Sequence, residues 1–390
     1  MPEHPLLSDS IHLLEQLVAH PVLGGQSNLS IAHFIGNFLE QAGIDYQYVT
    51  NEDGNKKAIH CRIGPAVDGG VILSGHTDVV PTEGQDWHTD PFQLTAQGDL
   101  LYGRGATDMK GFIACCLAAL PKMKIASLAK PIYFAFSYDE EIGCLSGPIV
   151  AKAIREHYEE RPAFAIIGEP TSMNLANAEK GMGVFETTIY SRAGHSSQIR
   201  TGASAIQEAA KLILWLEEKI EALIADGHTD DRFSPPHSTL QAGICHGGLA
   251  PNIVADQCHI QWDLRIIPKD DWQEILQDFL DYCQEREQIC QTKVPEFRIE
   301  TVPQYPFVPA LDTSPVSSVV EFTRPLVNEP SLTSVAFASE AGQFAAEGFE
   351  AVLCGPGHVD QCHIANEFIE KEQLSKCLHF MDQLIEQLSS

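Results

Sequence analysis

Three short apolar segments of this chain each end in acidic residues, and this repetition constrains the fold more than any other feature. The segments are Val71–Leu73, Ile132–Phe136 and Phe164–Ile167. The polar residues that follow them are, in order, His76 with Asp78, then Asp139 with Glu140 and Glu141, then Glu169. Short apolar runs bounded by polar residues are typical of buried parallel strands, and ligands bind at the carboxyl ends of such strands. The pattern predicts an α/β fold with a polar site at one edge of its sheet.

The acids at these strand ends favour a site for cations. Three adjacent carboxylates, Asp139–Glu141, repel one another unless solvent or cations compensate them, and apolar sequence flanks this triplet on both sides. Histidine and carboxylate side chains are the ligand types of zinc sites. Asp108 lies in GRGATDMKG before the apolar stretch Phe112–Leu120 and can join this site, although taken alone it is as consistent with a helix cap. The recurrence predicts a shared polynuclear cation site.

Length and composition narrow the class of protein. With 390 residues and an apolar fraction of 44%, the chain is long for a single core, so two domains are expected. The formal charge of −28 disfavours partners such as nucleic acid and anionic membranes. No secretory signal or apolar run of about 20 residues is seen. Eleven cysteines without regular spacing indicate reduced thiols, so a cytoplasmic location is expected.

The order of predicted elements indicates an insertion. From Gly181 the pattern becomes β-α-β-β-α-β, with helices at Ala203–Ile224 and Trp272–Glu285, which is typical of a ferredoxin-like α+β module. After Tyr305 the α/β pattern resumes and ends in an amphipathic helix, Glu372–Leu388. We therefore expect a first domain of residues 1–180 and 304–390, interrupted by a second domain of residues 181–303.

Five motifs together resemble one known family. They are GHTDVVP, GRG followed by TDMKG, the triplet DEE, GEP and a late histidine. In this order, and over essentially the whole chain, they resemble the M20 family of dinuclear zinc amidohydrolases and exopeptidases. The resemblance implies a zinc-exopeptidase-like catalytic domain with a central, mostly parallel sheet. It also implies that the inserted domain is a dimerisation domain and that the chain forms a homodimer.

The same resemblance assigns the metal ligands. It implies two zinc ions per subunit, for which Co²⁺ can substitute, with Asp108 bridging them. One zinc would be held by His76, Asp108 and Glu169, and the other by Asp108, Glu141 and His363. His358 lies only five residues before His363, and the family's placement of its ligand histidine selects His363.

The resemblance also assigns roles next to the metals. Asp78 would orient His76, and Glu140 would be the general base. The residues alone leave the base open between Asp139 and Glu140.

Four further residues are candidates for contact with the substrate or the transition state. The resemblance implies that His195, in AGHSSQ, crosses the dimer interface and stabilises an oxyanion. It pairs Asn252 with Arg265 as substrate contacts, although Arg265 is also consistent with a structural ion pair. Glu340, in FASEAGQF, could face a substrate amine or serve as an ordinary loop or cap residue.

Two longer stretches, SYDEEIGCLSGP and IIGEPTSMNLANAEKGMG, suggest a branch of the family. They resemble the members that hydrolyse N2-acetyl-L-ornithine to L-ornithine and acetate in arginine biosynthesis. The alternatives are a succinyl-diaminopimelate desuccinylase and a broader hydrolase of N-acyl amino acids. A more remote alternative is a non-catalytic binding protein stabilised by metal, which a missing base or ligand would have favoured; every expected residue is present.

Overall fold

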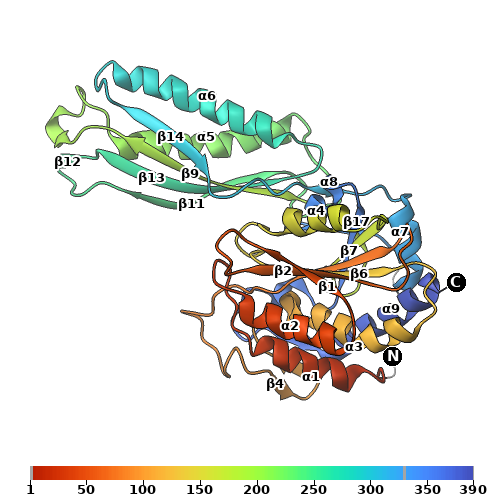
Figure 1. The fold of residues 1–390 in the computed structure, drawn as a ribbon. Coiled ribbons are helices and arrows are strands. Elements are labelled where there is room, and N and C mark those ends of the chain that lie inside the picture. The colour runs from red at the N-terminus through yellow and green to blue at the C-terminus, as the bar shows by residue number, and fades with distance from the viewer. Residues whose placement is uncertain (1–2, 328–330, 390) are drawn as a thin grey trace. The chain divides into compact units, whose positions relative to one another are not determined.

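The protein, for which we have a computed structural model, has two compact units (Figure 1). The structure describes residues 3–327 and 331–389. The first unit comprises Met1–Ala178, Leu311–Ser334 and Ser339–Ser390, so far as these ranges are described, and the second comprises Glu179–Ala310 and Val335–Ala338. The expected fold class is confirmed: a mixed, mostly parallel central sheet occurs together with a separate small antiparallel sheet.

The first unit is built on a nine-stranded sheet, in the order β1-β2-β6-β3-β7-β17-β8-β15, with β16 paired to β8. Its strands are β1 (Tyr46–Thr50), β2 (Lys57–Ile63), β3 (Val71–His76), β6 (Ile132–Ser137), β7 (Phe164–Pro170), β8 (Ala176–Glu179), β15 (Leu311–Asp312), β16 (Thr333–Val335) and β17 (Glu350–Gly355). The middle strands β6, β3, β7 and β17 are parallel. This parallel centre is the part of the sheet that positions the candidate site.

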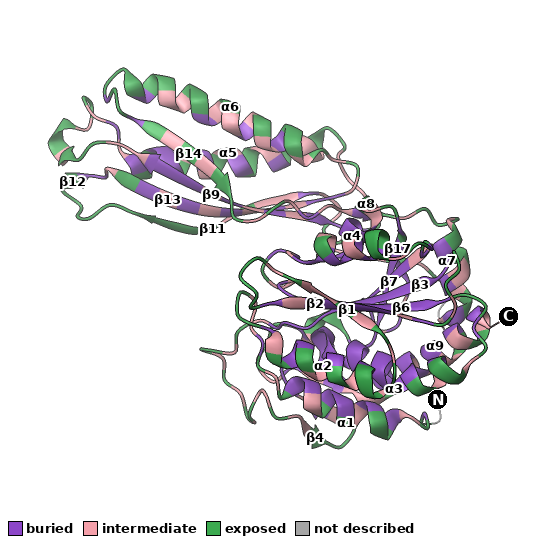
Figure 2. Cartoon of the chain, in the orientation of Figure 1, coloured by how far each residue is buried: buried purple, intermediate pink, exposed green. Residues whose placement is uncertain are grey.

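Strands β3, β6 and β7 begin at the same level of the sheet. Val71 of β3 is in register with Ile132 of β6 and with Phe164 of β7. Nearly every residue of these strands is buried, as their continuous apolar sequences predict (Figure 2). Their carboxyl ends therefore lie side by side, and the polar residues that follow them meet at one edge.

Helices cover both faces of this sheet (Figure 1). Helices α1, α2, α3 and α9 lie on one face, and α4 and α8 lie on the other. Their bounds are α1 (Leu7–Val18), α2 (Leu29–Gln41), α3 (Gly111–Ile125), α4 (Gly147–His157), α7 (Ser318–Thr323), α8 (Ala341–Ala346) and α9 (Lys371–Leu388). Helix α3 is buried on almost every side, which fits its sequence GFIACCLAALPKMKI. Helix α3 follows directly after the irregular turn Ala106–Lys110. Because α3 is packed in the core, it fixes the position of this turn and of Asp108 within it.

Several short strands were not predicted from the sequence. A three-stranded sheet is formed by β4 (Thr95–Gln97), β5 (Leu100–Tyr102) and β18 (Phe368–Glu370). Antiparallel pairing of β5 with β18 joins segments about 270 residues apart in the sequence. Because β18 follows the late histidine and β5 precedes Asp108, this sheet brings the two loops of the site together.

The second unit has the β-α-β-β-α-β order that the sequence predicts. Its main sheet is antiparallel in the order β11-β13-β9-β14, the strand order of a ferredoxin-like module. The elements are β9 (Gly181–Tyr190), α5 (Ala205–Ala225), β11 (Thr239–Gly247), β13 (Gln257–Ile266), α6 (Trp272–Gln291) and β14 (Arg298–Pro303), with a small pair β10 (Gly194–His195) and β12 (Ile253–Val254). Ile260, Trp262 and Leu264 are buried on the helix-covered face of β13.

No helix in the described part of the chain combines the length and apolar character needed to cross a membrane.

Candidate metal centre

His76 stands at the carboxyl end of β3 with its ring buried. Its Nδ1–H donates to the backbone oxygen of Asp78 at 2.9 Å. Because a carbonyl oxygen can only accept, this bond fixes the tautomer and points Nε2 at Oδ1 of Asp108, 3.0 Å away. The Asp78 carboxylate lies farther from the ring, with Oδ1 3.8 Å from Nδ1. The backbone of Asp78 is therefore the closer orienting group for His76.

The Asp78 carboxylate has a second task. Its two oxygens accept hydrogen bonds from the backbone N–H groups of Glu140 and Glu141, at 3.1 and 3.2 Å. These bonds tie the loop after β6 to the loop after β3. One buried aspartate thus fixes the backbone of both glutamates that the sequence nominates for the site.

Asp108 lies between two histidines. Its Oδ1 is 3.0 Å from Nε2 of His76, and its Oδ2 is 3.3 Å from Nε2 of His363. The two oxygens of one carboxylate therefore face two different imidazoles. This is the arrangement that a ligand shared by two cations requires.

Two groups of side chains within the described residues have the composition and spacing of a metal site. The first is His76, Asp108 and Glu169, and the second is Asp108, Glu141 and His363; within each group the ligand atoms all lie within 4.8 Å of one another. They contain the same residues as the two ligand sets that the family resemblance implies. Asp108 belongs to both.

The charges of these groups are poorly compensated without cations. Burial, followed by the charge of Asp108, raises the pKa of Glu169 well above its ordinary range and raises the pKa of Glu141 to about 7. Hydrogen bonds to Asp108 and Glu141 raise the pKa of His363 to about 10. Among the described residues, no hydrogen-bond donor reaches the buried Oε1 of Glu169. Divalent cations fit this set, because they would satisfy the orphaned oxygen and hold the carboxylates together.

Glu140 and Asp139 have different surroundings, which separates the two candidates for the base. The Asp139 carboxylate accepts from the backbone of Gly25 at 2.8 Å and forms a buried ion pair with Lys56. Glu140 belongs to neither ligand group; its Oε2 is 3.9 Å from Nε2 of His76. Burial raises the pKa of Glu140 well above its ordinary range. The charge of His76 opposes this increase, and the charges of Glu141 and Asp108 add to it. Glu140 thus lies beside the ligand His76 and accepts from the thiol of Cys144 at 3.2 Å, whereas Asp139 is engaged by the buried Lys56.

The two late histidines are also distinguished by their contacts. His363 Nε2 is 3.1 Å from Oε2 of Glu141. The ring of His358 contacts its own loop: Nδ1 accepts from the backbone N–H of Asp360 at 3.1 Å. This bond caps the short helical turn Val359–Gln361. His358 therefore has a local capping contact, whereas His363 faces the carboxylates.

The remaining predicted residues lie in different surroundings. In the second unit, His195 is exposed and its strand pairs with Ile253, and the backbone of Asn252 accepts from Ser196 at 3.1 Å, so these two predicted residues are neighbours. Arg265 lies on β13 and pairs with Asp263 at 3.1 Å.

Glu340, in the first unit, precedes α8 and is buried. Burial raises the pKa of Glu340 to about 7. Contact of Glu340 with a substrate stays a prediction.

Sequence reasoning missed a buried glutamate, Glu367, whose carboxylate is fully enclosed. It accepts from the backbone N–H groups of Gly105 at 2.9 Å, Thr107 at 2.8 Å and Asp108 at 3.1 Å, and from the guanidinium of Arg104 at 2.8 Å. Glu367 thus shapes the turn that carries the shared ligand. The only sequence signal was an acid four residues after His363.

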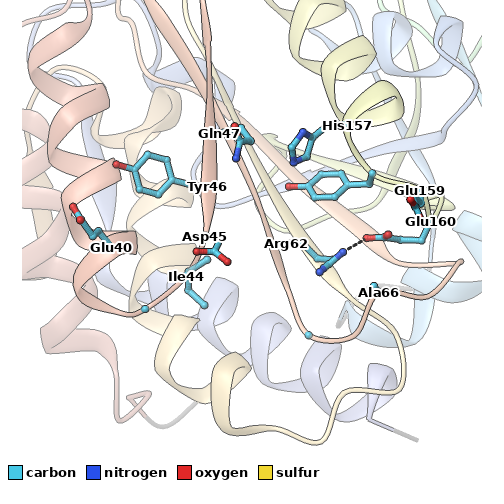
Figure 3. Close-up of a pocket in the computed structure, with 13 residues that line it drawn as sticks. Glu40, Ile44, Asp45, Tyr46, Gln47, Arg62, Ala66, His157, Glu159 and Glu160 are labelled. Atoms are coloured by element: carbon cyan, nitrogen blue, oxygen red, sulfur yellow. Dashed lines mark hydrogen bonds and ion pairs between the residues drawn. The ribbon is translucent and has the colours of Figure 1, made fainter.

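A separate hollow of about 790 Å³ lies near the amino-terminal ends of the parallel strands (Figure 3). Its polar lining includes Glu40, Asp45, His157 and the ion pair between Arg62 and Glu160, which joins the two side chains at 2.6 Å. Among the described residues that line it, none is a predicted site residue. The hollow and the candidate metal centre are therefore distinct.

Comparisons with known proteins agree with this geometry. The model of peptidase family M20/M25/M40 matches residues 72–387. An acetylornithine deacetylase of Proteus mirabilis is 31% identical over 384 residues, covering 96% of each chain, and one of Aliivibrio salmonicida is 28% identical over 363 residues, covering 92% of each.

Solved structures show the same fold at low identity. An M20 family metallo-carboxypeptidase of Sulfolobus solfataricus has a TM-score of 0.77 at 17% identity, covering 98% of this chain and 99% of that one. A Bacillus subtilis protein described as a dinuclear metal binding peptidase from the M20 family has a TM-score of 0.66 at 14% identity, covering 97% of each.

Proposed function

Because the chain belongs to peptidase family M20/M25/M40, a family of metallohydrolases, we propose that it hydrolyses N2-acetyl-L-ornithine to L-ornithine and acetate. The observation that carries the chemistry is the pair of ligand groups joined through Asp108, with Glu140 beside them. The substrate is suggested by the relatives named acetylornithine deacetylase, at about 30% identity over nearly the full length.

We propose that two zinc ions occupy the centre and that cobalt can replace them. His76, Asp108 and Glu169 would hold one ion, and Asp108, Glu141 and His363 the other. When bound, such ions polarise an amide carbonyl and lower the pKa of a water molecule toward neutrality. The donor set of imidazoles and carboxylates suits zinc.

Glu140 is proposed as the proton carrier of the reaction. As general base it takes a proton from the attacking water, and as acid it returns that proton to the nitrogen that leaves as the amine of ornithine. The water oxygen becomes part of acetate, so one water is consumed for each amide bond broken. The Asp78 carboxylate supports this role, because its bond to the Glu140 backbone N–H, at 3.1 Å, limits the positions of the side chain.

The second unit is proposed to recognise the substrate. His195 would donate to the oxygen on which negative charge develops. Asn252 and Arg265 would bind the substrate's carboxylate, Arg265 through its planar guanidinium. Arg265 forms an ion pair with Asp263, and each of the two side chains is about one-third exposed. A substrate carboxylate would therefore compete with Asp263 for the guanidinium group of Arg265.

A homodimer is proposed through the edge strand β11. This strand lies at the margin of its sheet, so one row of its backbone N–H and C=O groups is unpaired within the unit. Ile244 on β11 is exposed, and Leu249, just after the strand, is 84% exposed. A second copy of the chain pairing with this edge would cover both of these side chains.

We propose a cytoplasmic location, which agrees with eleven free thiols.

The test is amide hydrolysis by the zinc-loaded protein with equal concentrations of N2-acetyl-ornithine, N-succinyl-diaminopimelate and acetyl-methionine. We expect strong preference for N2-acetyl-ornithine. Preference for either other substrate would move the protein to another activity of the same family. Failure to hydrolyse any of them with two cations bound would contradict the enzymatic proposal.

A further inference from the structure

A chain of polar contacts connects the shared ligand Asp108 to the exposed ligand His363. It begins at Glu367, whose Oε1 accepts from the backbone N–H groups of Asp108 at 3.1 Å and of Thr107 at 2.8 Å. The other oxygen of Glu367 accepts from Nη1 of Arg104 at 2.8 Å. Both side chains of this ion pair are 1% exposed, so solvent does not compete for it.

The chain continues through the side-chain amide of Gln85. Its Oε1 accepts from Nη2 of Arg104 at 2.5 Å and from the indole N–H of Trp87 at 3.0 Å. Its Nε2 donates to the backbone oxygen of His363 at 3.0 Å. The two ends of one amide group therefore hold the buried arginine and the loop of the ligand histidine.

His363 needs support of this kind. It lies in a loop, and its side chain is 58% exposed, whereas the side chain of His76 on β3 is 1% exposed. Its φ angle of 62° lies in the left-handed region, which a residue other than glycine adopts only where its surroundings hold it. The neighbouring Asn366 ties the same two loops, because its Oδ1 accepts from the backbone of His88 at 2.8 Å.

We propose that Gln85 is a positioning residue for the group Asp108, Glu141 and His363, acting through the His363 backbone and not by touching a cation. This inference rests on the proposed dinuclear centre and adds a residue that neither the sequence pattern nor the two ligand groups contain. Among the interactions of the described residues, Gln85 contacts the His363 backbone directly but reaches the shared ligand Asp108 only through Arg104 and Glu367, so its larger effect is expected on the half that contains His363.

The experiment measures cation binding to the metal-free full chain by calorimetry with Zn²⁺ and, separately, Co²⁺. For Gln85→Ala we expect affinity at one of the two binding steps to fall by about 10- to 100-fold, the usual effect of removing a group that orients a ligand. The loss at the other step should be clearly smaller, because Gln85 reaches the shared ligand Asp108 only through Arg104 and Glu367. Gln93→Ala is the matched control, because Gln93 is an exposed glutamine of the following loop, and it should leave both steps unchanged.

A second variant separates the two ends of the amide. Gln85→Glu keeps an acceptor for Arg104 and Trp87 but removes the donor to the His363 oxygen, so it should reproduce the loss at one binding step. Parental binding in either Gln85 variant would overturn the proposal, as would an equal loss at both steps together with a lower Tm. A parent chain that binds fewer than two cations would refute the dinuclear centre itself. Since no substrate is present, a wrong substrate assignment leaves this test unaffected.

Discussion

The two halves of the candidate metal centre are built in different ways. The group His76, Asp108 and Glu169 draws two of its members from the ends of adjacent core strands, β3 and β7, and the side chain of His76 is 1% exposed. The group Asp108, Glu141 and His363 relies on loops, and the side chain of His363 is 58% exposed. The first half is held by the hydrophobic core, whereas the second depends on hydrogen bonds between loops distant in sequence.

This difference suggests separate functions for the two halves. A ligand on a rigid strand keeps its geometry whether or not a cation is present. A ligand on an exposed loop is free to adjust when a cation or substrate binds, provided that contacts such as that of Gln85 limit its range. The predictions below test whether core support and loop support have different consequences.

The largest expected effect concerns Glu140, which lies beside the buried half. Glu140→Ala should reduce turnover of N2-acetyl-ornithine by about 100- to 10,000-fold, because a general base is removed. Both cations should remain bound, since Glu140 belongs to neither ligand group. Turnover and cation content are measured on the same preparation.

The control for this prediction is the neighbouring Asp139→Asn. Asp139 pairs with the buried Lys56, so this variant should lose stability while any folded protein keeps most of its turnover. Loss of a cation in Glu140→Ala, with activity retained, would instead make Glu140 a ligand.

The second prediction compares His76→Ala with His363→Ala directly. In the cation-free protein, His76→Ala leaves the buried carboxylates of Asp108 and Glu169 without their nearest imidazole, so the free energy of unfolding should fall by about 3 kcal/mol. His363→Ala should cost less, about 1 to 2 kcal/mol, because solvent screens its exposed side chain although its partners Asp108 and Glu141 are buried. Urea unfolding of both variants and the parent measures the difference. Equal losses would show that exposure does not separate the two halves.

His76, Glu141 and Glu169 could be nominated from local sequence because they follow short apolar runs, whereas Asp108 and His363 could not. Short apolar runs ending in His76 and Glu169 indicate strand ends, and parallel register then places them together. His363 follows no such run; its selection over His358 came from a family resemblance. Asp139 and Glu140 are adjacent and chemically alike, and only the ion pair of Asp139 with Lys56 distinguishes them.

Long-range contacts explain what the sequence failed to reveal. Glu367 bonds to the turn at Asp108, 259 residues away, and Gln85 bonds to His363, 278 residues away. No periodicity within a window of 11 to 18 residues reports such pairs. The strands β4, β5 and β18 were missed because each has three residues, which is too short to show alternation of apolar and polar side chains.

A third prediction separates acid sensitivity of the fold from that of the centre. His60 on β2 is buried, and its Nδ1 lies 3.1 Å from the hydroxyl of Tyr158. Burial, followed by the charge of His157, lowers the pKa of His60 from 6.5 to about 4. Between these values the unfolded chain binds the proton and the folded chain does not, so stability falls as the pH decreases from 6.5 to 4.

The measurement is urea unfolding of the cation-free protein at pH 7 and pH 5. The contribution of His60 to the loss should be about 2 kcal/mol, and His60→Gln should remove that part of the pH dependence. The control is His12→Gln, an exposed histidine of α1. If His60→Gln leaves the slope between pH 7 and pH 5 as in the parent, the acid sensitivity arises from a group other than His60.

The smallest expected effect concerns the other exposed histidine in the late loop. The side chain of His358 is 54% exposed, nearly the same as that of His363, so exposure alone does not distinguish them. Their contacts do: His358 caps a short helical turn through the backbone of Asp360, and His363 faces two carboxylates. His358→Ala should therefore lower the free energy of unfolding by about 0.5 to 1 kcal/mol, as loss of a cap does, with both cations bound at parental affinity. Urea unfolding and calorimetry on this variant, beside His363→Ala, decide the matter. A lost cation in His358→Ala would mean that the loop can present either histidine, and that the exposed half is defined by the loop as a whole and not by one residue in it.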